Sequence, residues 1–334
     1  MPTESPIEQA ALYNAFMDGT LIIDKPPGLT SHDVVARVRH LLQERRVGHT
    51  GTLDPFATGV LVLLVGRATR LAQFLSGLDK EYEAVIRLGF ATDTGDFTGK
   101  PLFNSEAHGA DASVRRNVKF DEAEIVAALA GLRGEIDQVP PMYSAKKQQG
   151  RKLYELARRG EEVERPPVRI TIRRFEMNRA KGALLKDNLD GTYDLDVLVA
   201  CSGGTYVRTL AEDFGKRLGV GAHLAELRRT RVGEFEIKGA ATLEQLKESV
   251  VEESLGRVLL PPDAALSHLP SIELRADELG RVRNGVKIDV KNPVWTNGEH
   301  VRLHDEHGHL VAVARFEAEK QTLHPRVVLA QDGI

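Results

Sequence analysis

The sequence predicts an α+β fold with a small β-rich unit at its C-terminal end. Apolar residues recur with a period of two in some segments, as in strands, and with a period near 3.6 in others, as in helices. These segments are mixed without regular strand–helix–strand alternation, which favours α+β over a doubly wound parallel sheet. A break at Pro261-Pro262 precedes short strand-like pieces in residues 269–329, a region about half the commonest domain size.

The first hundred residues contain both apolar strands and helices. Ser31 is the predicted N-cap of a helix whose apolar face runs from Val34 to Leu42. Further along, Tyr82 and Ile86 should face the same side, because side chains alternate along a strand. In chain order we expect a strand at 20–24, the capped helix, a strand at 60–65, a helix at 69–78 and a strand at 81–88.

Beyond residue 100 the mixture of helices and strands continues. Residues 103–119 are polar, with Gly and Ser, and predict a loop insertion. Asp121 is the predicted N-cap of the next helix, and Asp305-Glu306-His307-Gly308 predicts a turn. The elements expected between these two points are a helix at 121–132, a basic helix at 151–159, strands at 168–175 and 193–201, and an amphipathic helix at 204–218.

Positive charge is concentrated in one segment of the chain. The whole sequence has 45 Lys and Arg against 48 Asp and Glu, a formal net charge of −3. Residues 144–186 contain 13 basic and 5 acidic residues, a net of +8, which leaves −11 on the remainder. Such asymmetry suggests one face that meets a polyanion, whereas a solvated helix and hairpin would explain the same charges without a partner.

The composition excludes several classes of protein and site. Cys201 is the single cysteine, which excludes an intrachain disulfide and a multi-cysteine zinc site and fits a reducing cytoplasm. The longest aliphatic run, residues 60–65, is far shorter than a membrane span, and no secretory signal opens the chain. We therefore expect a cytoplasmic protein with no membrane association. His304, His307 and His309 surround a predicted turn, so we expect no metal site there.

The most informative stretch is residues 48–59, Gly-His-Thr-Gly-Thr-Leu-Asp-Pro-Phe-Ala-Thr-Gly. Its glycines allow backbone angles that other residues resist, and Pro55 holds Asp54 away from the helical region. The loop is therefore built to present one acid at a fixed place. Local chemistry alone leaves two interpretations open and favours the second: a functional carboxylate, or an aspartate that bonds its own backbone in an Asp-Pro turn.

The full string decides between them, because it closely resembles the signature of the TruB family of tRNA pseudouridine synthases. The resemblance extends along nearly the whole chain and is loosest in the tail, from about Leu266. Further matching segments are Asp24-Lys25-Pro26-Pro27-Gly28-Leu29-Thr30-Ser31, Lys80-Glu81-Tyr82, Ala91-Thr92-Asp93-Thr94-Gly95-Asp96, Pro140-Pro141-Met142-Tyr143-Ser144-Ala145, Gly204-Thr205-Tyr206-Val207-Arg208-Thr209-Leu210 and Ala222-His223-Leu224-Ala225-Glu226-Leu227-Arg228-Arg229.

The resemblance implies a particular fold and domain order. It predicts the pseudouridine synthase fold, a mixed and largely antiparallel central sheet flanked by helices, plus a small β-rich C-terminal domain similar to a PUA domain. It places an N-terminal extension at 1–17, the catalytic domain at 18–265 and the PUA-like RNA-binding domain at 266–334. The basic segment, at about 140–186, resembles the RNA-gripping insertion of the stand-alone enzymes of the family.

The resemblance also implies an activity. Members of the family isomerise uridine to pseudouridine at position 55 in the T loop of tRNA: the C1′–N1 bond breaks, the uracil rotates and a C1′–C5 bond forms. The family needs no cofactor and no metal. We accordingly expect the T stem-loop of tRNA as the partner, no required protein partner and a monomeric enzyme.

Seven residues receive roles through the resemblance. Asp54 is the expected catalytic carboxylate, Arg208 its ion-pair partner and Tyr82 the ring that stacks on the target uracil. His49, Tyr206, Leu227 and Lys25 are the expected substrate-contacting or loop-steadying residues. Without the family, Tyr82 would be a core tyrosine, Arg208 a surface arginine, His49 a solvated loop histidine and Lys25 an exposed turn lysine.

Two other functions stay open at this point. One is the same chemistry on another RNA, as in guide-dependent archaeal and eukaryotic relatives. The other is an RNA-binding or RNA-folding protein with a secondary or vestigial active site. The presence of Asp54, Tyr82 and Arg208 argues against loss of activity.

Overall fold

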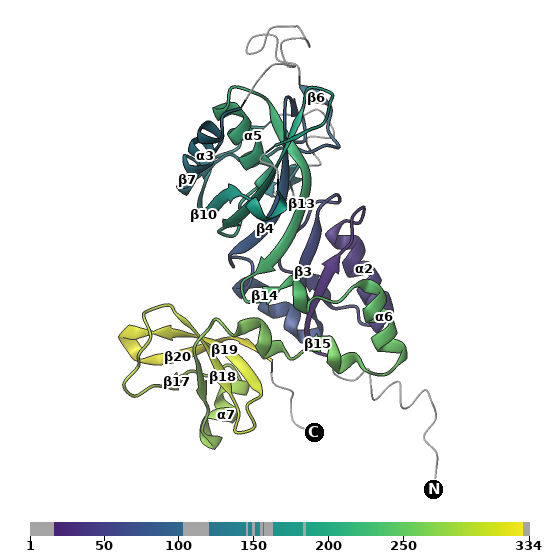
Figure 1. Ribbon diagram of the computed structural model, residues 1–334. Coiled ribbons are helices and arrows are strands. Elements are labelled where there is room, and N and C mark those ends of the chain that lie inside the picture. Colours follow the sequence, from purple (N-terminus) through teal and green to yellow (C-terminus); the bar gives the residue numbers. More distant parts are fainter. Residues whose placement is uncertain are drawn as a thin grey trace.

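The computed structural model describes residues 17–102, 120–144, 146–148, 151–153, 156, 163–182 and 185–329. Figure 1 shows a large sheet with helices on it and a separate small sheet at the C-terminal end. The predicted N-terminal extension, the insertion at 103–119 and most of the predicted helix at 151–159 lie outside the described residues.

The central sheet has eleven strands and is mixed, as the sequence predicts. Among the described strands its pairings are antiparallel except one, the short parallel contact between β3 and β13. The three side strands are β2 (Val47–His49) on β3, β11 (Lys186–Asp187) on β12 and β14 (Phe235–Glu236) on β13. The main order is β15 (Leu259–Leu260), β1 (Gly19–Lys25), β3 (Thr58–Val65), β13 (Ala222–Val232), β4 (Lys80–Leu88), β12 (Tyr193–Cys201), β10 (Val168–Met177) and β7 (Gly134–Gln138).

Helices cover the sheet in two groups, and each group closes its own apolar core. One core joins α3 (Glu122–Ala130) and α5 (Val207–Arg217) to β4, β10 and β12. The other joins α2 (Ser31–Leu42) and α6 (Leu243–Val251) to β1 and β3. The long strands β4 and β13 lie side by side in Figure 1 and reach from the first group toward the second. The loop of residues 50–57 connects the two groups, because Leu53 and Ala57 pack in the first core and Ser31 of α2 bonds the backbone of Leu53.

Most predicted strands and helix faces are confirmed. Tyr82 and Ile86 are buried on one side of β4, Asp121 caps α3, and Cys201 is fully buried. The turn at residues 305–308 joins β18 to β19. Short pieces complete the chain: β5 (Ala91–Thr92), β6 (Pro101–Leu102), β8 (Lys147–Gln148), β9 (Arg151–Lys152) and 3-10 turns at Arg179–Lys181, Ile237–Gly239, Leu255–Arg257, Pro262–Leu266 and Ala318–Lys320.

Three local predictions are wrong. The N-cap of α2 is Thr30, which forms a capping box with Asp33, and Ser31 is already helical. The segment expected as a helix at 69–78 is the 3-10 helix η1 (Gly66–Phe74), in which Ala68 and Leu71 are buried at the three-residue spacing of that helix. Residues 151–152 pair with β8 in a hairpin, so the helix expected from 151 starts later, and Leu153 and Leu156 are its described helical residues.

The C-terminal unit is the β-rich element that the sequence predicts. Its five strands run in the order β16, β18, β19, β20, β17 around an apolar core of their own. A second cluster joins this unit to η1, because Leu266 and Val327 pack with Leu71 and Leu75. The elements are β16 (Ser271–Glu273), α7 (Ala276–Arg283), β17 (Ile288–Asp289), β18 (His300–His304), β19 (Leu310–Glu317) and β20 (Thr322–Val328).

The packing of the C-terminal unit on η1 generates a first prediction. Leu266 is fully buried in that interface, so Leu266→Ala should lower the free energy of unfolding by about 2–5 kcal/mol through lost contacts and a residual cavity. Urea unfolding followed by circular dichroism measures the loss. Leu189→Ala is the matched control, because Leu189 is 92% exposed and its truncation should stay within about 0.5 kcal/mol. Equal effects from both variants would show that the interface contributes nothing to stability.

Candidate active site

Asp54 lies in the loop between β2 and β3, and neighbouring residues fix the backbone on either side of it. Ser31 Oγ accepts the Leu53 N–H at 2.8 Å and donates to the Leu53 carbonyl at 3.2 Å. On the other side, Lys25 Nζ and the Gly28 N–H both donate to the Pro55 carbonyl, at 3.2 and 2.8 Å. The backbone of the aspartate is therefore held by residues from β1, the turn after it and α2.

Arg229 holds the same loop through backbone carbonyls. Its side chain is 1% exposed, and its guanidinium donates to the carbonyls of Val60, Gly51 and Thr52 at 2.7, 3.0 and 3.4 Å. Gly59 makes this close approach possible: its φ is +101°, and a Cβ there would lie 2.1 Å from the Arg229 carbonyl oxygen. Only glycine fits at this position.

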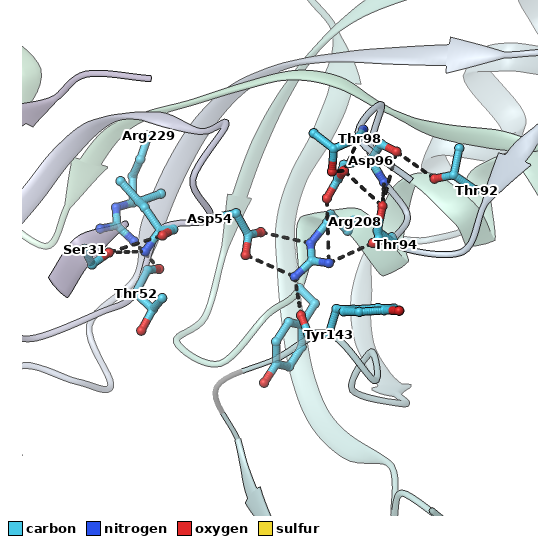
Figure 2. A network of polar contacts seen from close by, with 12 residues as sticks. Ser31, Thr52, Asp54, Thr92, Thr94, Asp96, Thr98, Tyr143, Arg208 and Arg229 are labelled. Atoms are coloured by element: carbon cyan, nitrogen blue, oxygen red, sulfur yellow. Dashed lines mark hydrogen bonds and ion pairs between the residues drawn. The ribbon is translucent and has the colours of Figure 1, made fainter. Parts of the chain in front are cut away.

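Asp54 and Arg208 form a bidentate ion pair (Figure 2). Arg208 Nε lies 2.9 Å from Asp54 Oδ2, and Nη2 donates to Oδ1 at 3.1 Å. The guanidinium, only 5% exposed, also donates to the carbonyls of Thr94 and Tyr143, each at 2.7 Å. Arg208 lies in the first turn of α5, so its position depends on a helix that begins 153 residues after Asp54. The two residues meet only in the folded chain.

Opposing effects set the pKa of Asp54. Burial raises the pKa above its usual value, the Arg208 guanidinium opposes that rise, and the nearby Asp96 carboxylate adds to it. Asp96 is itself 3.8 Å from Arg208 Nη1 and accepts hydrogen bonds from Thr94 and Thr98 (Figure 2). Arg208 thus contacts two carboxylates, and its charge favours the ionised form of Asp54, whose side chain is 32% exposed.

A cavity of about 240 Å³ opens beside Asp54, large enough for one pyrimidine base. Tyr82 is buried in its wall, and burial raises the pKa of its phenol to about 12, so the ring is neutral. The lining includes five of the seven residues that the sequence analysis selected: Asp54, Tyr82, Tyr206, Arg208 and Leu227. The other lining residues are Gly51, Thr52, Leu53, Ser76, Lys80, Ser144, Gly204, Thr205, Val207 and Arg229.

The remaining two selected residues lie outside that lining. Lys25 is fully buried and acts on the loop backbone, so it is no exposed turn lysine. His49 ends β2, with its ring edge-on to His32 at a centroid distance of 5.3 Å. Burial, with added repulsion from His32 and Arg229, lowers the pKa of His49 to about 4, so this imidazole is neutral at physiological pH.

Sequence reasoning did not assign roles to Ser31, Lys80, Asp96 or Arg229 at this site. Each belongs to a segment already matched to the family, yet none stood out by residue type. One signal was present: Lys80 lies two residues before Tyr82 on β4, which places both side chains on the same face of the strand. Ser31, Asp96 and Arg229 act through contacts with distant loops, which no local pattern reveals.

Metal-ligating side chains do not cluster in the part of the chain that the structure describes. Its residues contain no group of three or more His, Cys, Asp or Glu placed to hold a metal ion. His304 instead bonds Asp263, with 2.8 Å between Nε2 and Oδ1. None of the helices that the structure describes is long and apolar enough to cross a membrane. The site is therefore a carboxylate beside a base-sized cavity.

The overall fold is the pseudouridine synthase fold. It resembles a structure of an H/ACA RNP bound to a substrate RNA containing 2′-deoxyuridine, with a TM-score of 0.68 at 25% identity over 98% of this chain and 88% of that one. It also resembles a crystal structure of a Cbf5-Nop10-Gar1 complex, with a TM-score of 0.69 at 26% identity over 96% and 86%. These likenesses include the C-terminal unit as well as the central sheet.

The chain belongs to the TruB family of pseudouridylate synthases. Residues 39–207 match the TruB family pseudouridylate synthase N-terminal domain, and residues 208–267 match the tRNA pseudouridylate synthase B C-terminal domain. Proteins named tRNA pseudouridine synthase B are similar over most of their length. Those of Aromatoleum aromaticum, Moorella thermoacetica and Bacillus cytotoxicus are 47%, 45% and 38% identical, over 80%, 90% and 95% of this chain and 80%, 94% and 98% of theirs.

The tie between α2 and the loop generates a prediction. Ser31→Ala should lower the free energy of unfolding by about 1–3 kcal/mol, because the buried Leu53 N–H loses its acceptor. It should also slow RNA modification, since the carboxylate next to Leu53 loses its fixed position. Urea unfolding and a rate assay measure the two effects. Ser267→Ala, at an exposed serine, is the control; if both variants behave alike, the hydrogen bonds of Ser31 do not position the loop.

The ion pair predicts a specific pH dependence. Asp54 must be ionised to act, so the rate of pseudouridine formation should fall as the pH drops through the raised pKa of Asp54. Arg208→Met should move this acid limb to higher pH, because the carboxylate keeps its burial and loses the cation that opposes the shift.

Single-turnover rates measured across pH test this for the wild type, Arg208→Met and the control Arg217→Met, which changes an exposed arginine on the same helix. An acid limb that stays in place in Arg208→Met contradicts the assigned role of the ion pair.

Proposed function

We propose that this protein isomerises uridine 55 in the T loop of tRNA to pseudouridine, with Asp54 as the catalytic carboxylate. One observation supports this most: Asp54 makes a bidentate contact with Arg208, which favours the ionised carboxylate, at the wall of a cavity that fits a single base. The similarity to proteins named tRNA pseudouridine synthase B supports the choice of tRNA as substrate.

The geometry suits each demand of the reaction. The target base must leave the RNA stack to reach Asp54, and stacking on the Tyr82 ring offsets part of that cost, by roughly 1–3 kcal/mol. The carboxylate then attacks C1′ or stabilises the positive charge that develops on the sugar, and both routes require it ionised. The buried cavity holds the detached uracil away from water, so that C5 replaces N1 at C1′ and hydrolysis is avoided.

The other residues have supporting roles in this proposal. Tyr206 and Leu227 line the cavity and pack on the base. Lys25 steadies the loop through the Pro55 carbonyl. The neutral ring of His49, at the end of β2 beside His32, lies outside the cavity, where it contacts the RNA around the flipped nucleotide. Arg208 keeps Asp54 charged.

RNA contacts outside the cavity fall to other parts of the chain. We assign residues 18–265 to the catalytic domain, with the basic segment at about 140–186 gripping the T stem-loop, and residues 266–334 to a PUA-like RNA-binding domain. The net charge of +8 on residues 144–186 supports the first assignment, because cations that neutralise phosphates supply most of the non-specific affinity for RNA. The extension at 1–17 receives no role.

A guide-dependent reaction is the second candidate, since the similar solved structures are assemblies of an H/ACA RNP and of Cbf5 with Nop10 and Gar1. Identity of 38–47% to proteins named tRNA pseudouridine synthase B, against 25–26% to those two structures, favours a stand-alone monomeric enzyme. A transcribed T stem-loop incubated with this protein alone decides: pseudouridine supports the stand-alone enzyme, and none overturns it.

Asp54→Asn should abolish turnover and leave RNA binding nearly intact. The variant removes the carboxylate needed for chemistry, while Arg208 keeps its contacts with the Thr94 and Tyr143 carbonyls and with Asp96. Pseudouridine in digested tRNA is measured by mass spectrometry, and affinity by filter binding. The wild type prepared in parallel is the control. Product above a buffer blank from Asp54→Asn would sink the assignment of this residue.

A further inference from the structure

The cavity contains more positive charge than the ion pair explains. Its ionisable lining comprises three cations, Lys80, Arg208 and Arg229, and one carboxylate, Asp54. Arg208 already pairs with that carboxylate. Within the described part of the chain, neither Lys80 nor Arg229 has a carboxylate within 4.0 Å. Buried cations are costly unless something compensates them, so this excess calls for an explanation.

Arg229 is explained by the backbone it holds. All three of its guanidinium nitrogens donate to carbonyls of the Asp54 loop or of β3. Lys80 is different. Its Nζ donates to two carbonyls, Leu78 at 2.7 Å and Ser76 at 3.4 Å, and an ammonium has three protons. Its side chain therefore retains donor capacity at the cavity wall.

Lys80 lines the same cavity as Asp54 and reaches it from β4. Two other lining residues lie close to Lys80. The Ser76 carbonyl accepts a hydrogen bond from Lys80 Nζ, and a Cβ on Gly51 would lie 3.6 Å from Lys80 Cε. A base bound with its C1′ at Asp54 therefore shares this cavity with the ammonium.

We propose that Lys80 is a catalytic residue whose ammonium stabilises the negative charge on the detached uracil. The inference rests on the proposed function and adds a partner for the leaving base. Burial lowers the pKa of Lys80 to about 8, so the ammonium is largely protonated at neutral pH. The uracil anion in the cavity would supply the counter-charge that Lys80 lacks among the described residues.

The charge arises from the bond changes themselves. When C1′–N1 breaks, its electron pair goes to N1, and the uracil becomes an anion with charge shared among N1, O2 and O4. A ring electron pair then forms the C5–C1′ bond, the C5 proton is lost and N1 gains a proton, so the isomerisation releases no net proton. The uracil anion exists only between the breaking of C1′–N1 and the formation of the product. The ammonium therefore stabilises this state more than it stabilises the bound substrate or the bound product.

The test compares two target bases in the same T stem-loop: uracil and 5-fluorouracil, whose anion is more stable because fluorine withdraws electrons. Single-turnover consumption of the parent nucleoside is measured for the wild type and Lys80→Met. With uracil, Lys80→Met should slow the reaction by about 10²-fold, the effect of removing one charge-stabilising donor, with RNA binding retained. With 5-fluorouracil the loss should be clearly smaller, because that anion needs less help.

Two further variants complete the design. Lys80→Arg keeps the positive charge and should recover most of the rate, and Lys216→Met, at a lysine 71% exposed on α5, should match the wild type. The ratio of the two rates within one preparation is independent of how much protein is folded. An equal loss on both bases, or a loss in RNA affinity alone, overturns the role of Lys80. A wild type that makes no pseudouridine overturns the proposed function instead.

Discussion

The ion pair between Asp54 and Arg208 is the interaction on which the rest of the site depends. A buried carboxylate without a cation would take up a proton, and a buried guanidinium without acceptors would be more costly still. The structure meets both needs, because Arg208 contacts Asp54 with two nitrogens and donates to the Thr94 and Tyr143 carbonyls as well. The ion pair therefore favours the charged form of the carboxylate and fixes its position.

Neighbouring side chains hold the Asp54 loop mainly by hydrogen bonds to backbone carbonyls. The buried side chains of Lys25 and Arg229 donate hydrogen bonds to carbonyl oxygens of the loop and of β3. Ser31 Oγ accepts the N–H of Leu53, the residue before Asp54. Such contacts restrict the loop without adding a further carboxylate beside Arg208, which already lies near Asp54 and Asp96. A site preorganised in this way needs little rearrangement when charge develops on the sugar and the base.

Our two proposals together divide the charge within the cavity: Asp54 would face the sugar, where positive charge develops, and Lys80 the base, where negative charge develops. The fold permits this division because β4 supplies Lys80 and Tyr82, while α5 supplies Arg208, the partner of Asp54. The C-terminal unit packs on η1, the helix that directly precedes β4 in the chain. Any RNA that this unit binds would therefore be held at a fixed position relative to β4.

The sequence by itself determined the elements with strong periodicity and the loop with an unusual composition. The alternation in β4, the apolar face of α2 and the Gly-, Thr- and Pro-rich segment around Asp54 are local patterns, and each was predicted from neighbouring residues. The cap at Thr30, the 3-10 form of η1 and the roles of Asp96, Lys80 and Arg229 were not. The roles of these three residues depend on contacts between segments far apart in the chain, such as that of Arg229 with the Gly51 carbonyl, whereas the cap at Thr30 is a local capping box one position before the predicted cap. Burial and counter-charges exist only after those segments meet, so only the tertiary structure decides which lysine or arginine is functional.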